Sequence, residues 1–370
     1  MNEVGGYVAA FGVATVLSVL LTPAMMRLAR RWSMLDVPTS ATAHETATPY
    51  LGGVAISLSF LVAVAIAALI NPPGARGGEL TMVLIVAATL TIAGLIDDLW
   101  GLPIAARLGV EIVGAIAIWE FGEGAQLFGE PIIDGAITVL WIVGVVNAFN
   151  LLDHHDGLSA GVAIIAAGWF FVLAAINDQQ LVASFAIGLA GCSLGFLRMN
   201  FPPARIFMGD AGSLFLGFLL AVIGLKLSFP DNDRSVTFLT PVFVVGLALF
   251  DTTLVVVSRL SSGTSPLQGG RDHSAHRLRS MGVPNRAIAV LLYVAAVASG
   301  WVGLIISLSG RLNAYLLAGL AAFLALVAGL MLLAVPVLGV RTPASVAALQ
   351  RTLGWEQPSE GRPRGGSPPD

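Results

Sequence analysis

Charged side chains are scarce in this sequence, since only 11% of its 370 residues are Asp, Glu, Lys or Arg. A soluble domain carries about 25% of them, so the composition excludes an ordinary soluble domain. Long apolar runs recur instead, and the mean hydropathy is +0.86. A run of about 20 apolar residues is long enough to cross a bilayer as a helix. The sequence therefore predicts an all-α, polytopic membrane protein.

Cysteine and lysine are almost absent, with one residue of each. The single Cys192 excludes an intramolecular disulfide, and its apolar surroundings favour a small core residue. No basic residue precedes the first apolar run, residues 5–28, whereas Arg27, Arg30 and Arg31 lie at its end. A secretory signal peptide has the opposite order of charge, so we expect this run to be a retained first helix.

Eleven membrane spans can be drawn from the hydropathy pattern, at roughly 5–28, 50–70, 80–96, 104–119, 136–150, 158–176, 181–197, 212–229, 236–258, 287–308 and 312–335. The fourth is the least apolar because it contains Arg107 and Glu111. The last stretch, GWEQPSEGRPRGGSPPD, is polar and rich in Pro and Gly, which is typical of disorder. We predict an integral membrane catalytic domain over residues 1–340 and a cytoplasmic, largely disordered tail over 341–370.

Arginine is distributed unevenly between the two sides of this arrangement. With the N-terminus outside, the outer loops hold only Arg76, Arg234 and Arg311. Fourteen arginines fall on the other side, namely Arg27, Arg30, Arg31, Arg198, Arg205, Arg259, Arg271, Arg277, Arg279, Arg286, Arg341, Arg351, Arg362 and Arg364. Because cytoplasmic loops carry the excess of basic residues, this 14-to-3 split predicts an outside N-terminus and a cytoplasmic C-terminus in the cell (inner) membrane.

Four polar clusters interrupt the apolar pattern, and all fall on the expected cytoplasmic side. They are DDLWGL (97–102), DHHDGL (153–158), FMGDAGS (207–213) and GGRDHSAHRL (269–278). His44 lies on the same side, as do the other four histidines. Clusters gathered on one membrane surface indicate one shared site.

The residue types in these clusters suit phosphoryl transfer. Asp97 and Asp98 are adjacent, Asp153 and Asp156 are one helical turn apart if helical, and Asp210 stands between glycines that permit close approach to an anion or metal. Oxygen ligands favour a hard cation such as Mg²⁺. The basic loop 271–279 supplies donors suited to phosphate, and its place at a membrane surface suggests a lipid substrate.

Each cluster also has a simpler interpretation. An aspartate pair at a helix end can be solvated or capping, Asp210 can cap a helix start, and loop histidines can face lipid headgroups. Asp251 inside the ninth span is costly in lipid, so we expect it to be functional or paired. An ion-coupled transporter is a distant alternative, but it requires acids near the bilayer midplane and inverted repeats.

The motifs appear in the order found in one family. HETATPYLGG, DDLWGL, NAFNLLDHHDGL, NFPPARIFMGDAGSLFLG and GGRDHSAHRL together resemble the polyprenyl-phosphate N-acetylhexosamine-1-phosphate transferases, which are related to phospho-MurNAc-pentapeptide translocase. The resemblance covers residues 5 to 335. It implies transfer of a sugar 1-phosphate, such as GlcNAc-1-phosphate, from a UDP-sugar to polyprenyl phosphate with release of UMP, as the first membrane step of cell-envelope polysaccharide synthesis. It also implies Mg²⁺, with Mn²⁺ as a substitute. No nucleic-acid partner is expected, and a homodimer is compatible with it.

The resemblance also implies roles for individual residues. The expected catalytic aspartates are Asp97, Asp98, Asp153 and Asp156, with Asp97 as the base for the lipid phosphate, and the metal ligands are Asp210 and Asp98. The expected nucleotide- or phosphate-binding residues are Asn147, Asn150, Asn200, Phe207, Arg271, His273 and His276, with Phe207 stacking on uracil. His44 and Arg107 are further site residues. Direct attack and a covalent aspartyl intermediate both fit these residues.

Three positions distinguish this chain within the resemblance. His154 stands where the family often has the first glycine of Asp-Gly-x-Asp-Gly, and Arg107 matches a family lysine. The peptidoglycan enzyme has a denser histidine motif that ends in a carboxylate, whereas this chain reads His-Ser-Ala-His-Arg-Leu. This favours the N-acetylhexosamine branch and leaves the muramyl-pentapeptide transferase as the alternative.

Overall fold

The computed structural model describes residues 3–36, 47–70, 77–122, 124–229, 232–267 and 270–337. His44 and the expected tail 341–370 lie outside these ranges. Within them the chain is almost entirely helical. Two short antiparallel strands also pair with each other, β1 (Leu35–Asp36) and β2 (Thr48–Pro49). The helices are α1 (Glu3–Arg31), α2 (Gly52–Ile70), α3 (Gly77–Trp100), α4 (Ile104–Glu120), α5 (Pro131–Leu152), α6 (Leu158–Ala175), α7 (Gln180–Asn200), α8 (Asp210–Lys226), α9 (Arg234–Val244), α10 (Gly246–Ser261), α11 (Ser274–Ser280), α12 (Asn285–Ser307) and α13 (Arg311–Leu333).

The protein is an all-α polytopic membrane protein. In the described part of the chain, eight helices are long and apolar enough to cross a membrane, and α9 with α10 passes the same test as a bent pair. The shorter α4 and α8 have 17 residues each. Every one of the eleven ranges drawn from hydropathy coincides with one of these ten helices or with the bent pair.

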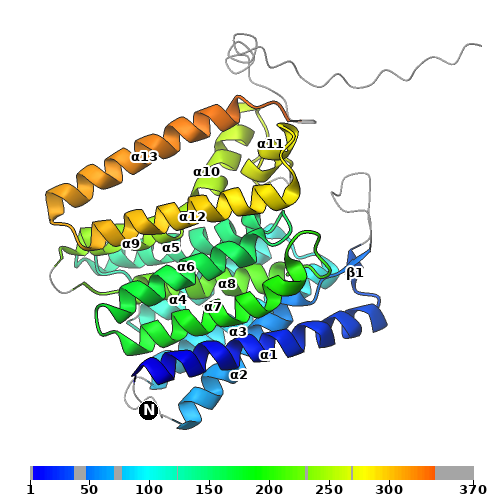
Figure 1. Cartoon of the computed structure of the whole chain (residues 1–370). Coiled ribbons are helices and arrows are strands. Elements are labelled where there is room, and N and C mark those ends of the chain that lie inside the picture. The colour runs from blue at the N-terminus through cyan, green and yellow to red at the C-terminus, as the bar shows by residue number, and fades with distance from the viewer. Residues whose placement is uncertain are drawn as a thin grey trace, which may run out of the picture.

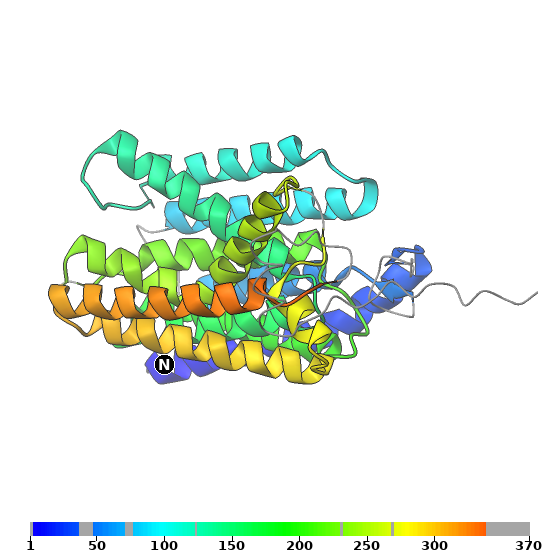
Figure 2. The ribbon, with the colours of Figure 1, turned by 90° about the horizontal axis from the view of Figure 1, so that it is seen from above.

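The segment drawn as a single ninth span is broken. α9 and α10 meet at an angle of 74°, and Val245 between them has φ −93° and ψ 14°, outside helical geometry. Pro241 has no N–H to donate within α9, which weakens the helix just before the break. The Ser299 hydroxyl donates to the carbonyl of Phe243, near the end of α9, at 2.6 Å. α10 therefore slants across the other helices, as Figure 2 shows.

The core is built around α8, in which every residue from 211 to 224 is buried. Close packing depends on glycines: a Cβ on Gly53 of α2 would lie 2.1 Å from the backbone nitrogen of Gly212, and one on Gly94 of α3 would lie 2.5 Å from the backbone of Asp210. At the other extreme, α13 lies at the edge of the bundle with Ala314 as its one buried residue (Figure 1). Asp210 is the first residue of α8, so the packing of this buried helix fixes the position of Asp210.

Candidate active site

A pocket of about 930 Å³ opens at the end of the bundle where α11 and β1 lie (right in Figure 1). It brings together all four polar clusters of the sequence. The predicted residues that line it are Asp98, Asn150, Asp153, Asp156, Asn200, Phe207, Asp210, Arg271 and His276. Residues to which the sequence analysis gave no individual role in the site also line it, among them Tyr50, His154 and His155, and so does Arg279 of the basic loop.

The carboxylate of Asp98 caps the N-terminus of α8. Its Oδ1 accepts the backbone N–H of Asp210 at 2.8 Å, and its Oδ2 accepts that of Ala211 at 3.2 Å. Gly209 has φ +71°, and a Cβ there would lie 2.5 Å from the Asp98 Oδ2. Glycine is therefore required at position 209. The sequence predicted that the glycines around Asp210 permit the close approach of an anion, and the anion found beside Gly209 is the carboxylate of Asp98. Each carboxylate oxygen keeps a second lone pair for another partner.

Asp97 and Asp210 are joined through Arg107. The Nη1 of Arg107 lies 3.2 Å from the Asp97 Oδ2 and 2.8 Å from the Asp210 Oδ2. The other Asp210 oxygen accepts from the Asn150 amide at 2.8 Å. Asp97 also accepts the N–H of Leu102 at 2.6 Å and is not among the residues that line the pocket. Arg107 therefore bridges the two aspartates that the resemblance assigns to base and metal ligand, and offsets one of their two negative charges.

Asn147 lies one turn deeper and does not reach the pocket. Its amide donates to Glu111, which is 1% exposed, and to the carbonyl of Val143 at 2.9 Å. Asn147, which was predicted to bind the nucleotide, is thus not among the residues that line the pocket. The sequence analysis named its partner Glu111 only as a residue that makes the fourth span less apolar. Its spacing of four residues from Arg107 is nevertheless typical of an ion pair on one helix face.

Asp153 and Asp156 do not share a helix face, because α5 ends at Leu152 and both lie in the turn that follows. The Asp156 Oδ2 accepts the N–H of Ala204 at 2.9 Å. Burial, followed by the negative charges of Asp210 and Asp98, holds the pKa of Asp153 well above its usual range. Such excess negative charge in one pocket is what a divalent cation would offset, so the oxygen donors present fit Mg²⁺ or Mn²⁺.

Asn200 joins the turn to the segment before α8. Its Oδ1 accepts the N–H of Gly157 at 3.0 Å, and its Nδ2 donates to the carbonyl of Ile206 at 2.9 Å. Gly157 has φ +73°, and its carbonyl accepts the hydroxyl of Tyr293 at 2.6 Å. The side chain of Asn200 is 3% exposed. It therefore positions the Asp153–Asp156 turn by bonds within the protein.

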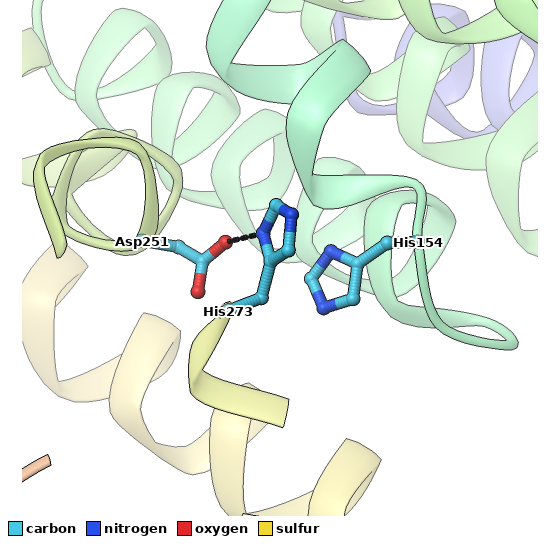
Figure 3. A group of neighbouring side chains, drawn as sticks. All are labelled: His154, Asp251 and His273. Carbon is cyan, nitrogen blue, oxygen red and sulfur yellow. Dashed lines mark hydrogen bonds and ion pairs between the residues drawn. The ribbon is translucent and has the colours of Figure 1, made fainter. Parts of the chain in front are cut away.

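Three histidines cluster beside this turn. The rings of His154 and His273 are stacked at 3.8 Å, and those of His154 and His276 lie 5.0 Å apart. Asp251 binds the Nδ1 of His273 at 2.8 Å and the N–H of Ser274 at 2.8 Å, so this intramembrane acid is paired, as expected. Figure 3 shows the carboxylate on one side of His273 and the ring of His154 on the other. His273 is 3% exposed and stands behind the residues that line the pocket.

Burial favours the neutral form of His154 and His276. It lowers the pKa of His154 well below its usual value and, together with the nearby His273, lowers the pKa of His276 to about 4. The ring nitrogens and the carboxylate of His154, His273 and Asp251 lie within 4.8 Å of one another. Zinc ligands at about 2.1 Å from a tetrahedral ion would be about 3.4 Å apart, with converging lone pairs. Near-parallel stacked rings do not converge on such an ion, so the geometry of the cluster does not favour zinc.

The basic loop divides into structural and pocket-facing arginines. Arg259 binds both oxygens of Asp272 at 3.0 Å. Arg277 donates to the carbonyls of Leu332 and Leu333 at the end of α13, at 3.0 and 3.2 Å. Arg271 and Arg279 face the pocket instead. The pocket lining therefore combines carboxylates with arginine and imidazole side chains.

Sequence comparison adds independent information. The profile of glycosyl transferase family 4 matches residues 80–228. A decaprenyl-phosphate N-acetylglucosaminephosphotransferase from Mycobacterium leprae is 30% identical over 325 residues, which cover 79% of this chain and 80% of the relative. The protein of that name from Mycolicibacterium smegmatis is 29% identical over 325 residues, covering 79% and 78%. A phospho-N-acetylmuramoyl-pentapeptide-transferase from Bacillus thuringiensis is 30% identical over 285 residues, covering 70% and 85%.

The fold and the pocket define a membrane-embedded enzyme whose polar site is built at one end of a helical bundle. The chain belongs to glycosyl transferase family 4, the polyprenyl-phosphate N-acetylhexosamine-1-phosphate transferases that its five motifs resemble, and it is a transferase.

Proposed function

We propose that the protein transfers N-acetylglucosamine 1-phosphate from UDP-GlcNAc to a polyprenyl phosphate and releases UMP. The observation that carries this proposal is the pocket itself, which gathers carboxylates, arginine and imidazole at one end of the membrane domain. The names of the mycobacterial relatives supply the substrate class. The product enters the synthesis of a cell-envelope polysaccharide.

The reaction requires two anions to meet. An oxygen of the lipid phosphate attacks the sugar-bearing phosphorus of the UDP-sugar, and the bond between that phosphorus and the bridging oxygen breaks, so that the oxygen leaves with UMP. At an effective dielectric constant near 20, two unit charges about 4 Å apart repel by about 4 kcal/mol. Arg271, Arg279 and His276 are placed to offset part of this repulsion by hydrogen bonds to the diphosphate.

The aspartates at the pocket are proposed to act on the lipid phosphate and the metal. Asp210 and Asp98 would hold Mg²⁺, or Mn²⁺ in its place, and Asp153 and Asp156 complete the negative side of the pocket. When bound, the cation supplies charge neutralisation at the transferred phosphoryl group. Asp97 would accept a proton from a singly ionised lipid phosphate. Phe207 lines the pocket as a flat surface for the uracil ring.

We also propose that the chain spans the membrane eleven times, with the N-terminus outside and the pocket on the cytoplasmic face of the cell (inner) membrane. The 14-to-3 arginine split supports this orientation. Arg271 and Arg279, which belong to the arginine-rich side, lie at the pocket. Arg234, which belongs to the arginine-poor side, lines a second, smaller cavity together with Lys226. The homodimer stays a prediction, which light scattering of the purified protein would test.

The decisive experiment is an assay of the purified protein with decaprenyl phosphate or undecaprenyl phosphate and a panel of UDP-sugars, detecting UMP. We expect UMP release with UDP-GlcNAc, and none from Asp210→Asn or in excess chelator. UMP release with UDP-MurNAc-pentapeptide alone would favour the peptidoglycan reaction, which the Bacillus thuringiensis relative represents. No release with any UDP-sugar would refute the proposal.

A further inference from the structure

Arg107 lies between two sets of carboxylates. Its Nη1 contacts Asp97 and Asp210 at 3.2 and 2.8 Å, on the side of the pocket. On its other side, its Nε lies 3.8 Å from the Oε1 of Glu111, one turn further along α4. That distance is too long for a hydrogen bond. The Arg107 Nε and the Glu111 Oε1 are both buried and have no hydrogen-bond partner.

Glu111 offers a second binding place for a cation. It is 1% exposed and lies about 10 Å along α4 from the start of the helix. A buried carboxylate in a membrane segment is costly unless it is paired. One oxygen accepts from Asn147, whose amide is held in turn by the Val143 carbonyl. The other oxygen points to Arg107, which is the cationic group placed beside it.

We propose that Arg107 is an exchangeable counterion, which leaves the Asp97–Asp210 pair for Glu111 when a divalent cation binds at Asp210. This rests on the metal role proposed for Asp210. A cation at the Asp210 Oδ2 would share that oxygen with the guanidinium and repel it. Shortening the contact between Arg107 and Glu111 from 3.8 Å to a hydrogen bond of about 2.9 Å needs a movement of about 1 Å.

The charges of the group are consistent with this exchange. Four carboxylates, Asp97, Asp98, Asp210 and Glu111, surround one guanidinium, so the fully ionised group carries −4 + 1 = −3, which a single divalent cation reduces to −1. The exchange also releases the Asp97 Oδ2 from its ion pair. The proposed base therefore becomes free to accept a proton only once the cation is in place, which orders the two events.

The test measures binding of Mn²⁺ to the purified full chain in lipid nanodiscs by the electron paramagnetic resonance signal of the free ion. Glu111→Gln should lower Mn²⁺ affinity about tenfold, because Arg107 then has no second anion to pair with and stays on Asp210. Arg107→Gln should raise the affinity, because the competing cation is gone. In the Arg107→Gln background, Glu111→Gln should change the affinity by less than about twofold, which completes a double-mutant cycle.

The outcomes separate this inference from the proposed function. If Asp210→Asn binds Mn²⁺ like the wild type, the metal role of Asp210 is wrong. If Asp210→Asn loses Mn²⁺ but Glu111→Gln has equal effects with and without Arg107, Glu111 acts only by its charge and the exchange is refuted. If Glu111→Gln does not fold, Arg107→Gln still tests the exchange. An Mn²⁺ affinity of Arg107→Gln that is equal to or lower than that of the wild type refutes it.

Discussion

Replacing Asp98 by asparagine tests whether one carboxylate serves both the fold and the reaction. The two oxygens of Asp98 accept the N–H groups of Asp210 and Ala211, at 2.8 and 3.2 Å. Asn keeps only one accepting oxygen, so one buried N–H at the start of α8 loses its partner. That loss costs about 1–3 kcal/mol.

The single cysteine provides the assay. Cys192 is fully buried in α7, so a thiol-reactive dye labels it only as the protein unfolds. We expect Asp98→Asn to unfold several degrees below the wild type in the same detergent. The control is Asp233→Asn, which removes an exposed ion pair of 3.3 Å with Arg311 and should cost at most about 1 kcal/mol. Equal unfolding temperatures for Asp98→Asn and the wild type would refute the capping role.

Three further predictions address topology, the base and the histidine cluster. A cysteine introduced near Asn177 should react with an impermeant reagent from outside and one near Ser274 should not, and the reverse pattern would refute the orientation. If Asp97 is the base, Asp97→Asn should recover activity as the pH rises through the lipid phosphate pKa of about 6, whereas a defect that stays flat indicates positioning or covalent catalysis. The pKa of His276 is about 4 in the folded protein, so between pH 6.5 and 4 the unfolded chain binds more protons. Stability should therefore fall as the pH drops through this window, and His276→Gln should flatten that part of the unfolding profile.

Hydropathy located the helices because burial in lipid imposes a minimum apolar length. It could not show that residues 236–258 bend, since the bend depends on Pro241, on helical geometry lost at Val245 and on Ser299 of another helix. The proline was visible in the sequence, but many membrane helices contain proline and remain continuous. The angle of 74° follows from contacts between helices far apart in the chain.

The polar clusters were visible for a similar reason, because ionisable residues stand out in an apolar sequence. Their individual partners were not. Asp98 and Asp210 are 112 residues apart, and only packing shows that one caps the helix on which the other stands. Asn147 differs from Asn150 by less than one turn, yet one faces Glu111 and the other faces the pocket. Motifs identify which residues gather, whereas the direction of each side chain is set by the helix on which it stands.

The attachment of α13 to Arg277 has a consequence for the enzyme in its bilayer. α13 has one buried residue, so lipid surrounds most of its surface, and the tilt of such a helix follows the thickness of the hydrocarbon layer. The last carbonyls of a helix have no partner within it, and here those of Leu332 and Leu333 accept from Arg277. Arg277 stands next to His276 in α11, at the pocket wall. We therefore expect a change of hydrophobic thickness to act on the part of the pocket lined by His276 and Arg279 through a helix that does not line the pocket itself.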